Sequence, residues 1–535
     1  MRPLVLLAMV SAGFLPATSQ TPGFAIAGQV VRHADDHPVR GARVSIAPVE
    51  QRDRRVFCRS GENGQFSFSG VSAGKYSLAV TDHEWSQAYK QFDYFSTAIA
   101  VGPGLDSEHI VFRLESPASI VGSVLDDAGD PVRGAMVYLF GRFLSRGAYQ
   151  TGMKGTVNTN ADGSFHFTRV APGTYYVAVS GRPWYAQNPP TTRPEIVRQP
   201  GVPETVGLGG PQNQPASQPD LDVAYPVTYY QNATSPEAAT PLKLEEGQRA
   251  DIKFNLQPVP ALHIALDGVP KDPDQQIFGQ LSQVGPGGSL IQVQAMPMNS
   301  EIVGVAPGNY VLSANLYGQK QPVTTGSQTV TLSSNSTVSL SNAVKTCVHG
   351  KVILDGQIPQ GLAVALKNSA VSVAHDGSFA FETLQPGRYS LFLANTSDLY
   401  MRTVTVKGGT FSNGELEVAA GADVELTITA ARGLSKVEGI VKKDDKPVEG
   451  AMVLLITQDF SHGKYIPRDQ SDSDGTFTLS SAPPGRYKLV AIDDGQDLEY
   501  ANPAVIAPYL EHGRVIDVPV PSSANIEVKV QQRKQ

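Results

Sequence analysis

Cysteine is scarce in this sequence, with only Cys58 and Cys347 among 535 residues. The two lie far apart in the chain and fall in what we interpret below as different folding units. Neither a disulfide framework nor a thiolate metal site is therefore expected, because both need several cysteines at short spacings. Stability has to come from the packing of apolar side chains.

The sequence also has no large excess of charge of one sign. It contains 43 Lys and Arg and 50 Asp and Glu, and charged residues make up 17% of the chain. Without a basic stripe, nucleic acid is not expected as a partner. Beyond the N-terminal segment, no apolar run approaches the roughly 20 residues that span a bilayer. We expect no transmembrane segment once that N-terminal segment is removed.

Glycine and proline, by contrast, are abundant, with 51 and 39 residues. This content of turn-forming residues argues against long exposed helices, while a hydrophobic fraction of 41% suffices to build cores throughout the chain. At roughly 100 to 150 residues per domain, the length predicts four or five compact units.

Residues 1–19 have the pattern of a signal peptide. Arg2 precedes an apolar run from Leu4 to Val10, and Ala17 and Ser19 stand where a signal peptidase reads small residues. We predict cleavage before Gln20 and a secreted product, located in the periplasm, at the cell surface or outside the cell. An uncleaved membrane anchor is the alternative, but it would need a longer apolar core.

Two short patterns recur at a fixed distance from each other. Asn-Gly-x-Phe or Asp-Gly-x-Phe is followed, ten residues after its glycine, by the glycine of Gly-x-Tyr. The glycine pairs are Gly64 and Gly74, Gly163 and Gly173, Gly377 and Gly387, and Gly475 and Gly485, and a fifth Gly-x-Tyr at Gly308 lacks the first pattern. Asn-Gly and Asp-Gly supply the positive φ of a hairpin turn, and we interpret the Pro-Gly before most of the tyrosines as a type II turn.

The residues between these turns predict strands. Apolar and polar residues alternate after each hairpin glycine and again after each Gly-x-Tyr, as in strands with one buried face. We predict that the repeated tyrosines pack their rings on the core and bond their hydroxyls to nearby backbone. These tyrosines are Tyr76, Tyr175, Tyr310, Tyr389 and Tyr487.

Each unit also opens and closes with a characteristic strand. The opening strand carries a central glycine and is followed by Pro-Val-x-Gly-Ala or a weaker version of it, and the closing strand alternates apolar and polar residues. The opening glycines are Gly28, Gly122, Gly350 and Gly439. Short strands separated by turns at intervals of about 8 to 12 residues predict an antiparallel sandwich of about 100 residues.

We therefore predict an all-β chain, a tandem array of about five antiparallel β-sandwich domains of the prealbumin-like or Ig-like type. The predicted domains are residues 20–116, 117–258, 259–345, 346–431 and 432–535. The third is divergent, since it keeps only the Gly-x-Tyr pattern. The second contains a long Pro/Gly-rich loop at 187–226.

The order Gly-x-Val, Pro-Val-x-Gly-Ala, Asp-Gly-x-Phe, Pro-Gly-x-Tyr resembles the carboxypeptidase regulatory-like domain, a prealbumin-like β-sandwich. It is similar too to the B-type repeats of bacterial surface adhesins. The resemblance implies the fold and a secreted bacterial protein. It implies no activity, because such modules accompany enzymes, adhesins and transporters without performing chemistry.

The sequence offers no clear catalytic constellation. None of the ten histidines begins a His-x-x-Glu or His-Glu-x-x-His pattern, so the zinc site of the carboxypeptidase catalytic domain has no counterpart. His33 and His37 bracket Asp35 and Asp36 and could offer metal ligands, but a solvated polar turn is the favoured interpretation. We expect no catalytic residue, no cofactor and no metal, and a cryptic hydrolase is the least favoured alternative.

Four aromatic residues are the candidates for ligand binding. Trp85 and Trp184 each lie eleven residues after the glycine of a Gly-x-Tyr, near Tyr89 and Tyr185. Aromatic side chains on loops at one end of a sandwich can stack on sugar rings, although packing in the core or an interface is the favoured interpretation.

The sequence thus predicts a noncatalytic, secreted binding or scaffold protein of the cell envelope or the extracellular space. An envelope protein or a polysaccharide is the expected partner, held by loops or by a strand added to a sheet edge. An array of carbohydrate-binding modules is the alternative function.

Overall fold

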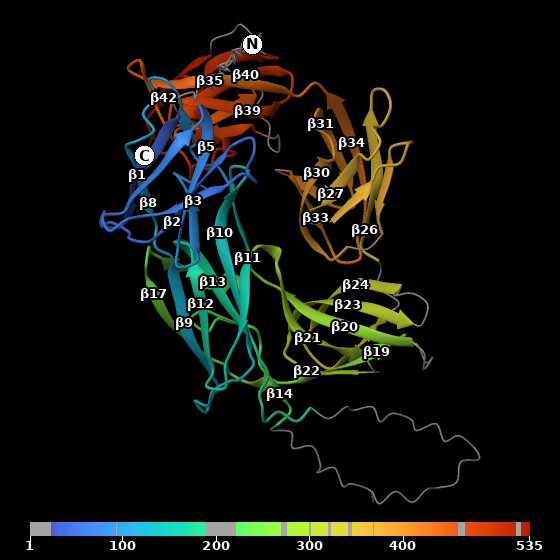
Figure 1. Cartoon of the computed structure of the whole chain (residues 1–535). Helices are drawn as coiled ribbons and strands as arrows, with labels where there is room; N and C mark the ends of the chain where they lie inside the picture. The colour runs from blue at the N-terminus through green and yellow to red at the C-terminus, as the bar shows by residue number, and fades with distance from the viewer. Residues whose placement is uncertain are drawn as a thin grey trace, which may run out of the picture. The chain divides into compact units, whose positions relative to one another are not determined.

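The chain is all-β apart from one α-helix and two short 3-10 turns among the residues that the computed structural model describes (Figure 1). These residues are 23–92, 94–188, 221–268, 275–298, 301–318, 323–340, 345–366, 369–382, 384–412, 414–457, 466–519 and 526–534. The predicted signal peptide and most of the predicted loop at 187–226 lie outside them. The chain divides into two compact units, which are treated separately: described residues up to Lys90 with Ser96–Leu114, and Gln91–Phe95 with the residues from Glu115 onward.

The first unit is one β-sandwich. One sheet has the order β4-β1-β8 and the other the order β3-β2-β5-β6, with β7 also paired to β5. The strands are β1 (Phe24–Arg32), β2 (Arg43–Pro48), β3 (Val56–Arg59), β4 (Gln65–Val71), β5 (Gly74–Asp82), β6 (Trp85–Ala88), β7 (Ile99–Val101) and β8 (Ile110–Leu114).

The second unit contains four further sandwiches, of which the first has sheets ordered β12-β9-β17 and β11-β10-β13-β15, with β16 paired to β13. Its strands are β9 (Ala118–Leu125), β10 (Met136–Ser145), β11 (Ala148–Asn158), β12 (Ser164–Val170), β13 (Gly173–Ser180), β14 (Val223–Ala224), β15 (Thr228–Tyr229), β16 (Leu242–Leu244) and β17 (Arg249–Asn255), with the 3-10 turn η2 (Pro236–Ala238). β14 pairs with β18 (Val259–Pro260).

The third sandwich has sheets ordered β22-β19-β25 and β21-β20-β23-β24. Its elements are β19 (Leu262–Asp267), β20 (Gln275–Val284), η3 (Pro286–Gly288), β21 (Leu290–Met298), β22 (Glu301–Val305), β23 (Gly308–Gly318), β24 (Val323–Leu332) and β25 (Ser336–Ser339).

The fourth sandwich has sheets ordered β29-β26-β34-β31 and β28-β27-β30-β33-β32. Its strands are β26 (Cys347–Leu354), β27 (Ala363–Leu366), β28 (Ser369–Ser372), β29 (Ser378–Phe381), β30 (Gly387–Ala394), β31 (Leu399–Lys407), β32 (Thr410–Ser412), β33 (Glu415–Val418) and β34 (Asp423–Arg432).

In the fifth sandwich the two sheets join through β42, which pairs with both β35 and β40. Its elements are β35 (Ser435–Lys443), β36 (Lys446–Pro447), β37 (Met452–Thr457), β38 (Arg468–Gln470), β39 (Thr476–Ala482), β40 (Gly485–Ile492), α1 (Pro503–Leu510), β41 (Arg514–Val518) and β42 (Glu527–Gln531). Ile506 and Tyr509 of α1 join a cluster with Met452 and Val490 on the sheet face opposite the core. This sheet is therefore apolar on both faces.

One pairing scheme recurs in all five sandwiches. The opening strand pairs antiparallel with the strand after the hairpin and parallel with the closing strand, so β1 lies between β4 and β8. The corresponding triplets are β9 with β12 and β17, β19 with β22 and β25, β26 with β29 and β34, and β35 with β39 and β42. The prediction of a tandem β-sandwich array is confirmed, and the divergent third unit shares this frame. The domain boundaries themselves stay a prediction.

A glycine faces a phenylalanine in four of these triplets. The register partners are Gly28 and Phe66, Gly122 and Phe165, Gly350 and Phe379, and Gly439 and Phe477. A Cβ on Gly28 would lie 2.0 Å from the carbonyl oxygen of Ile110 on the parallel closing strand. The opening glycine thus makes room for the closing strand on one side and stands opposite an aromatic ring on the other.

The third sandwich has no glycine at this position of its opening strand. Its pair Ile264 and Ile302 corresponds to Ile26 and Phe68 of the first sandwich, because Ile302 and Phe68 each lie eight residues before the corner tyrosine. The position of the opening glycine is therefore held by Leu266, which is buried in the core and faces Val338 of the closing strand.

The hairpin glycines have the predicted left-handed backbone. Gly64, Gly163, Gly377 and Gly475 have φ between 73° and 86°. The side chain of Asp162 accepts hydrogen bonds from the backbone N–H and the hydroxyl of Ser164, at 3.1 and 2.6 Å. The turn is therefore closed by its own aspartate.

The Pro-Gly glycines differ from the type II turn that we expected. Gly173, Gly387 and Gly485 have φ of 153° to 157°, far from the value near +80° of a type II turn, and each is the first residue of a strand. The expectation of a type II turn is wrong. The glycine is instead the residue that tolerates this φ, which residues with a side chain rarely adopt.

The repeated tyrosines have the predicted structural role. Each hydroxyl donates to the backbone carbonyl four residues earlier in the chain, as in a tyrosine corner. The bonds run from Tyr76 to Ser72 (3.1 Å), Tyr175 to Ala171 (2.7 Å), Tyr310 to Ala306 (2.6 Å), Tyr487 to Pro483 (2.8 Å), and Tyr389 to Gln385. The third sandwich keeps this corner as well.

Replacing Gly28 by Ala is expected to lower the free energy of unfolding of the first sandwich by about 1–3 kcal/mol, because the new methyl group overlaps the Ile110 carbonyl. Gly61→Ala is the matched control, since its nearest neighbouring atom lies 3.7 Å away, and it should cost less than about 0.5 kcal/mol. In a Trp184→Phe background Trp85 is the only tryptophan, so urea unfolding followed by its fluorescence reports on this sandwich. Equal losses of unfolding free energy in the two variants would contradict the packing argument.

Burial raises the pKa of Tyr310 to about 12. The folded state thus binds the phenolic proton more tightly, and the stabilisation is complete below the ordinary pKa near 10 and is lost as the pH rises through about 12. Subtracting the spectrophotometric titration of Tyr310→Phe from that of the wild type should leave one phenol with a midpoint near 12. A midpoint near 10 would show that this hydroxyl is not held in the corner.

Candidate functional site

The four aromatic candidates fall into two pairs with different environments. Trp85, on β6, packs against the core of the first sandwich. Tyr89 is only 6% exposed, and its ring centroid lies 5.9 Å from that of Phe112. Both rings therefore contribute to packing, and a part in ligand binding stays a prediction for this pair.

The second pair presents an open aromatic surface. Trp184 follows β13 and is 76% exposed, and the ring of Tyr185 meets it edge-on with centroids 5.8 Å apart. The Tyr185 hydroxyl donates to Asp127 at 3.2 Å. An uncovered indole face beside a hydroxyl and a carboxylate combines the stacking surface and the polar groups that sugars bind.

The loop that carries Asp127 is held by its neighbour. Asp126 is buried, and its Oδ1 accepts from the backbone N–H of Ala128 at 3.0 Å and of Asp130 at 2.7 Å. The loop between β9 and β10 is thereby fixed by its own side chain. Asp127 is consequently presented next to Tyr185 on a defined turn.

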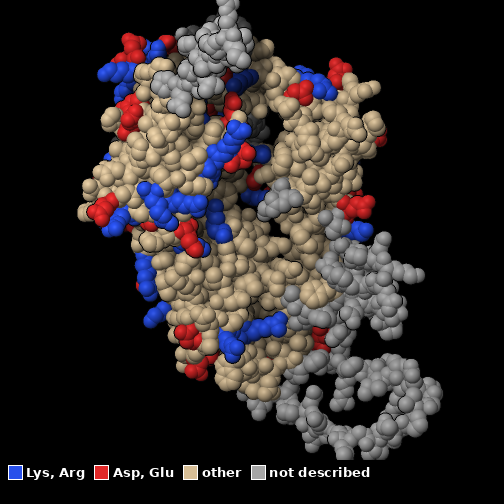
Figure 2. Space-filling view, viewed as in Figure 1, with Lys and Arg blue, Asp and Glu red and all other residues tan. Residues whose placement is uncertain are grey.

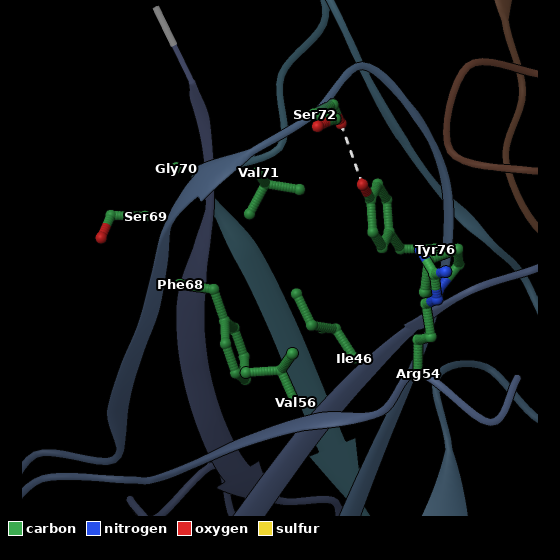
Figure 3. Close-up of a pocket in the computed structure, with 10 residues that line it drawn as sticks. Ile46, Arg54, Val56, Phe68, Ser69, Gly70, Val71, Ser72 and Tyr76 are labelled. Carbon is green, nitrogen blue, oxygen red and sulfur yellow. Dashed lines mark hydrogen bonds between the residues drawn. The ribbon is translucent and has the colours of Figure 1, made fainter. Parts of the chain in front are cut away.

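An apolar hollow of about 410 Å³ opens in the first sandwich. In Figure 3 the side chains of Ile46, Val56 and Phe68 gather on one side of the hollow, while Tyr76 reaches toward Ser72 on the other. Its lining residues are Ile46, Pro48, Arg54, Val56, Phe68, Ser69, Gly70, Val71, Ser72 and Tyr76. The hollow has the size and chemistry to accept an apolar side chain or a similar small group.

Ser72 in this hollow lies within Gly70-Val71-Ser72-Ala73-Gly74, which has the spacing Gly-x-Ser-x-Gly of a hydrolase nucleophile elbow. That elbow connects a strand to a helix, whereas these residues connect β4 to β5. The described lining contains no histidine to act as a base for Ser72. The spacing therefore reflects the tyrosine corner, since the Ser72 carbonyl accepts from Tyr76.

The loop with His33 and His37 has its carboxylates paired to arginines. Arg32 bonds Asp35 at 2.6 Å, and Arg113 bonds Asp36 at 3.0 Å. His37 Nδ1 lies 3.3 Å from Asp35 Oδ2. Because guanidinium groups already neutralise both carboxylates, the contacts favour the polar-turn interpretation over a metal site.

A different group brings together three side chains that can bind a metal. Cys347 on β26 and Asp423 on β34 are register partners, and His349 lies two residues along β26 on the same face. Cys347 Sγ donates to Asp423 Oδ1 at 2.9 Å, and His349 Nδ1 lies 3.0 Å from the same oxygen. Among the residues that the structure describes, this is the one group of three such ligands within 4.8 Å of one another.

Burial, followed by the hydrogen bond to Asp423, raises the pKa of the Cys347 thiol to about 11. The thiol is therefore protonated and a poor nucleophile. The aspartate also stands between the cysteine and the histidine, whereas a catalytic triad needs the histidine in the middle. The group is thus unsuited to nucleophilic catalysis.

Sequence reasoning missed this group because it considered only ligands at short spacings in the sequence, whereas Asp423 lies far from Cys347 and His349 in the chain. The alternation Cys347-Val348-His349 signals two ligands on one strand face. Asp423 could be added only with the register between two strands that are far apart in the chain.

Charged side chains of both signs are interspersed on the face drawn in Figure 2, and most of the described surface there is uncharged. Among the described residues, no helix has the length and apolarity to cross a membrane.

Two consecutive segments of the chain, residues 25–115 and 119–206, match the model of the carboxypeptidase regulatory-like domain. The chain thus carries this domain in tandem, as the order of its motifs predicts. The matched segments fall in the first two sandwiches, where the opening glycine, the hairpin and the tyrosine corner are all present. No curated protein sequence matches the chain.

Solved structures with some likeness include two bacterial pilins and a third bacterial protein. The minor pilin GBS52 of Streptococcus agalactiae is 12% identical, with a TM-score of 0.22, and the match covers 47% of this chain and 99% of the pilin. The shaft pilin SpaA of Lactobacillus rhamnosus GG is 10% identical, with a TM-score of 0.20, covering 44% and 98%. The Bacillus anthracis TIE protein is 10% identical, with a TM-score of 0.17, covering 96% and 75%. Scores this low support no conclusion about function.

Proposed function

We propose that this protein is a noncatalytic, secreted binding or scaffold protein of the cell envelope or the extracellular space. The observation that carries the proposal is that the repeated residues have structural roles. The hairpin glycines, the opening glycines with their phenylalanines and the corner tyrosines all serve turns and core packing. The repeated residues therefore build a frame, and the loops and edges that differ between the sandwiches are left for recognition.

The tandem carboxypeptidase regulatory-like domains support the noncatalytic part of the proposal. The resemblance implies modules that accompany active domains without performing chemistry themselves. The expected partner is an envelope protein or a polysaccharide. The apolar hollow of the first sandwich, with the exposed Val56 in its lining, offers one contact surface for such a partner.

Carbohydrate binding is the second candidate function, and one observation favours it. The open face of Trp184, with Tyr185 and Asp127 next to it, has the composition of a sugar-binding surface. The corresponding tryptophan of the first sandwich, Trp85, packs against the core. A single aromatic platform is thus a better description than an array of two.

In the native bacterium, the full chain should be found in the envelope or extracellular fraction, and cross-linking should capture a surface protein or polysaccharide. Fractionation followed by identification of the cross-linked material tests both expectations. A chain found wholly in the cytoplasm would refute the proposal. Turnover of a peptide or glycan that survives repurification and is lost with a single point change would instead establish the hydrolase alternative.

Replacing Trp184 by Ala should abolish retention of the full chain on a column of host surface polysaccharide, because the stacking surface is removed. The variant should keep its free energy of unfolding within about 0.5 kcal/mol, since the side chain is 76% exposed. Tyr94→Ala is the matched control, because Tyr94 is an aromatic residue with 73% exposure, and it should leave retention unchanged. If the Trp184 variant is retained as well as the parent, carbohydrate binding at this surface is excluded.

A further inference from the structure

We propose that Cys347, His349 and Asp423 form a binding site for one zinc ion on the fourth sandwich. The site goes beyond the proposed function, because it depends only on the pairing of β26 with β34. The protein would supply three ligands, one thiolate, one imidazole and one carboxylate, and water would take the fourth position.

The register of the parallel pair brings the three ligands together. Cys347 stands opposite Asp423, and His349 stands opposite Glu425, one pleat further along the same sheet face. The ligand atoms lie within 4.8 Å of one another, with 2.9 Å from Cys347 Sγ and 3.0 Å from His349 Nδ1 to Asp423 Oδ1. Zinc bonds of about 2.0 to 2.3 Å at tetrahedral angles place ligands roughly 3.3 to 3.7 Å apart, so small side-chain rotations suffice.

The ligand set selects the metal. Thiolate and imidazole favour zinc over calcium and magnesium, which prefer sites made of oxygen ligands alone. On binding, the ion takes the place of the thiol proton that now lies between Cys347 Sγ and Asp423 Oδ1, and this proton leaves to solvent. The side chains of His349 and Asp423 are 47% and 66% exposed, so the ion has direct access from solvent.

The carboxylate next to the site provides a matched comparison. Glu425, the register partner of His349, forms an ion pair with Lys407 on the neighbouring strand β31 at 3.6 Å. Replacing Glu425 by Gln therefore removes the same charge from the same sheet face as Asp423→Asn without removing a ligand. Cys58 provides the second comparison, since it is the only other cysteine and lies on β3 of the first sandwich.

A metal at this position would join the first strand of the fourth sandwich to its last strand. Binding to the folded form alone stabilises it by mass action. Zinc is thus expected to make the fourth sandwich harder to unfold, and this effect needs no contribution from any partner molecule.

The experiment titrates cobalt(II), which reports on zinc sites, into the full metal-free chain carrying Cys58→Ser. The expected result is binding of one ion with a thiolate-to-cobalt charge-transfer band and the intense visible bands of a tetrahedral ion, and displacement of both by zinc. Cys347→Ser should remove the charge-transfer band. His349→Ala and Asp423→Asn should weaken zinc binding by at least roughly tenfold, the minimum seen when even outer partners of a ligand are lost, while Glu425→Gln should bind like the parent.

Two results would overturn the site. The first is the absence of a charge-transfer band in the Cys58→Ser chain at millimolar cobalt. The second is equal weakening of zinc binding by Glu425→Gln and Asp423→Asn, which would show attraction to surface charge only. Circular dichroism of each variant verifies the fold, and Asp423→Asn, which keeps the shape of the side chain, tests the site even if Cys347→Ser lowers stability.

Discussion

The missing side chain at the centre of each opening strand is the constraint on which four of the five sandwiches depend. At Gly28 and Gly350, even a methyl group would lie 2.0 Å from a carbonyl oxygen of the parallel closing strand. The opposite partner of each glycine is a phenylalanine from the hairpin strand, so the ring supplies apolar volume where the glycine has none. In each case the phenylalanine follows the hairpin glycine by two residues, so the turn sets the register of the ring.

The tandem sandwich fold could be predicted from these glycines because their role is local. A positive φ at Gly163, or a corner formed by Tyr175 four residues from its acceptor, is set by neighbours in the chain. The predicted type II turn failed because the glycine before the tyrosine begins a strand, with φ of 153° to 157°, and does not close a turn. The shared frame of the third sandwich was hidden because Leu266 stands where the other opening strands have glycine, and because the Asp-Gly-x-Phe pattern is absent.

The candidate site was less accessible to prediction because it depends on burial and on distant register. Trp85 and Trp184 have the same spacing in the sequence, yet one packs on a core and the other is exposed. A buried hydroxyl in three of the sandwiches also escaped notice: Thr159 accepts from the Ala135 N–H and donates to the Val132 carbonyl, and Ser60 and Ser471 make the same two bonds. Each lies four residues before a hairpin glycine. The fixed spacing of this hydroxyl from the hairpin glycine is visible in the sequence. Its two backbone partners lie in a separate loop, so its role becomes clear only in the structure.

The parallel pairing of first and last strands has a mechanical consequence. Because β9 and β17 run side by side in the same direction over seven register pairs, a pull on the two ends of this sandwich acts at opposite ends of the paired strands. The load then shears the whole row of backbone hydrogen bonds at once instead of opening them one after another. A sandwich whose first and last strands are paired in this way resists stretching better than a hairpin of equal length, whose hydrogen bonds open one at a time.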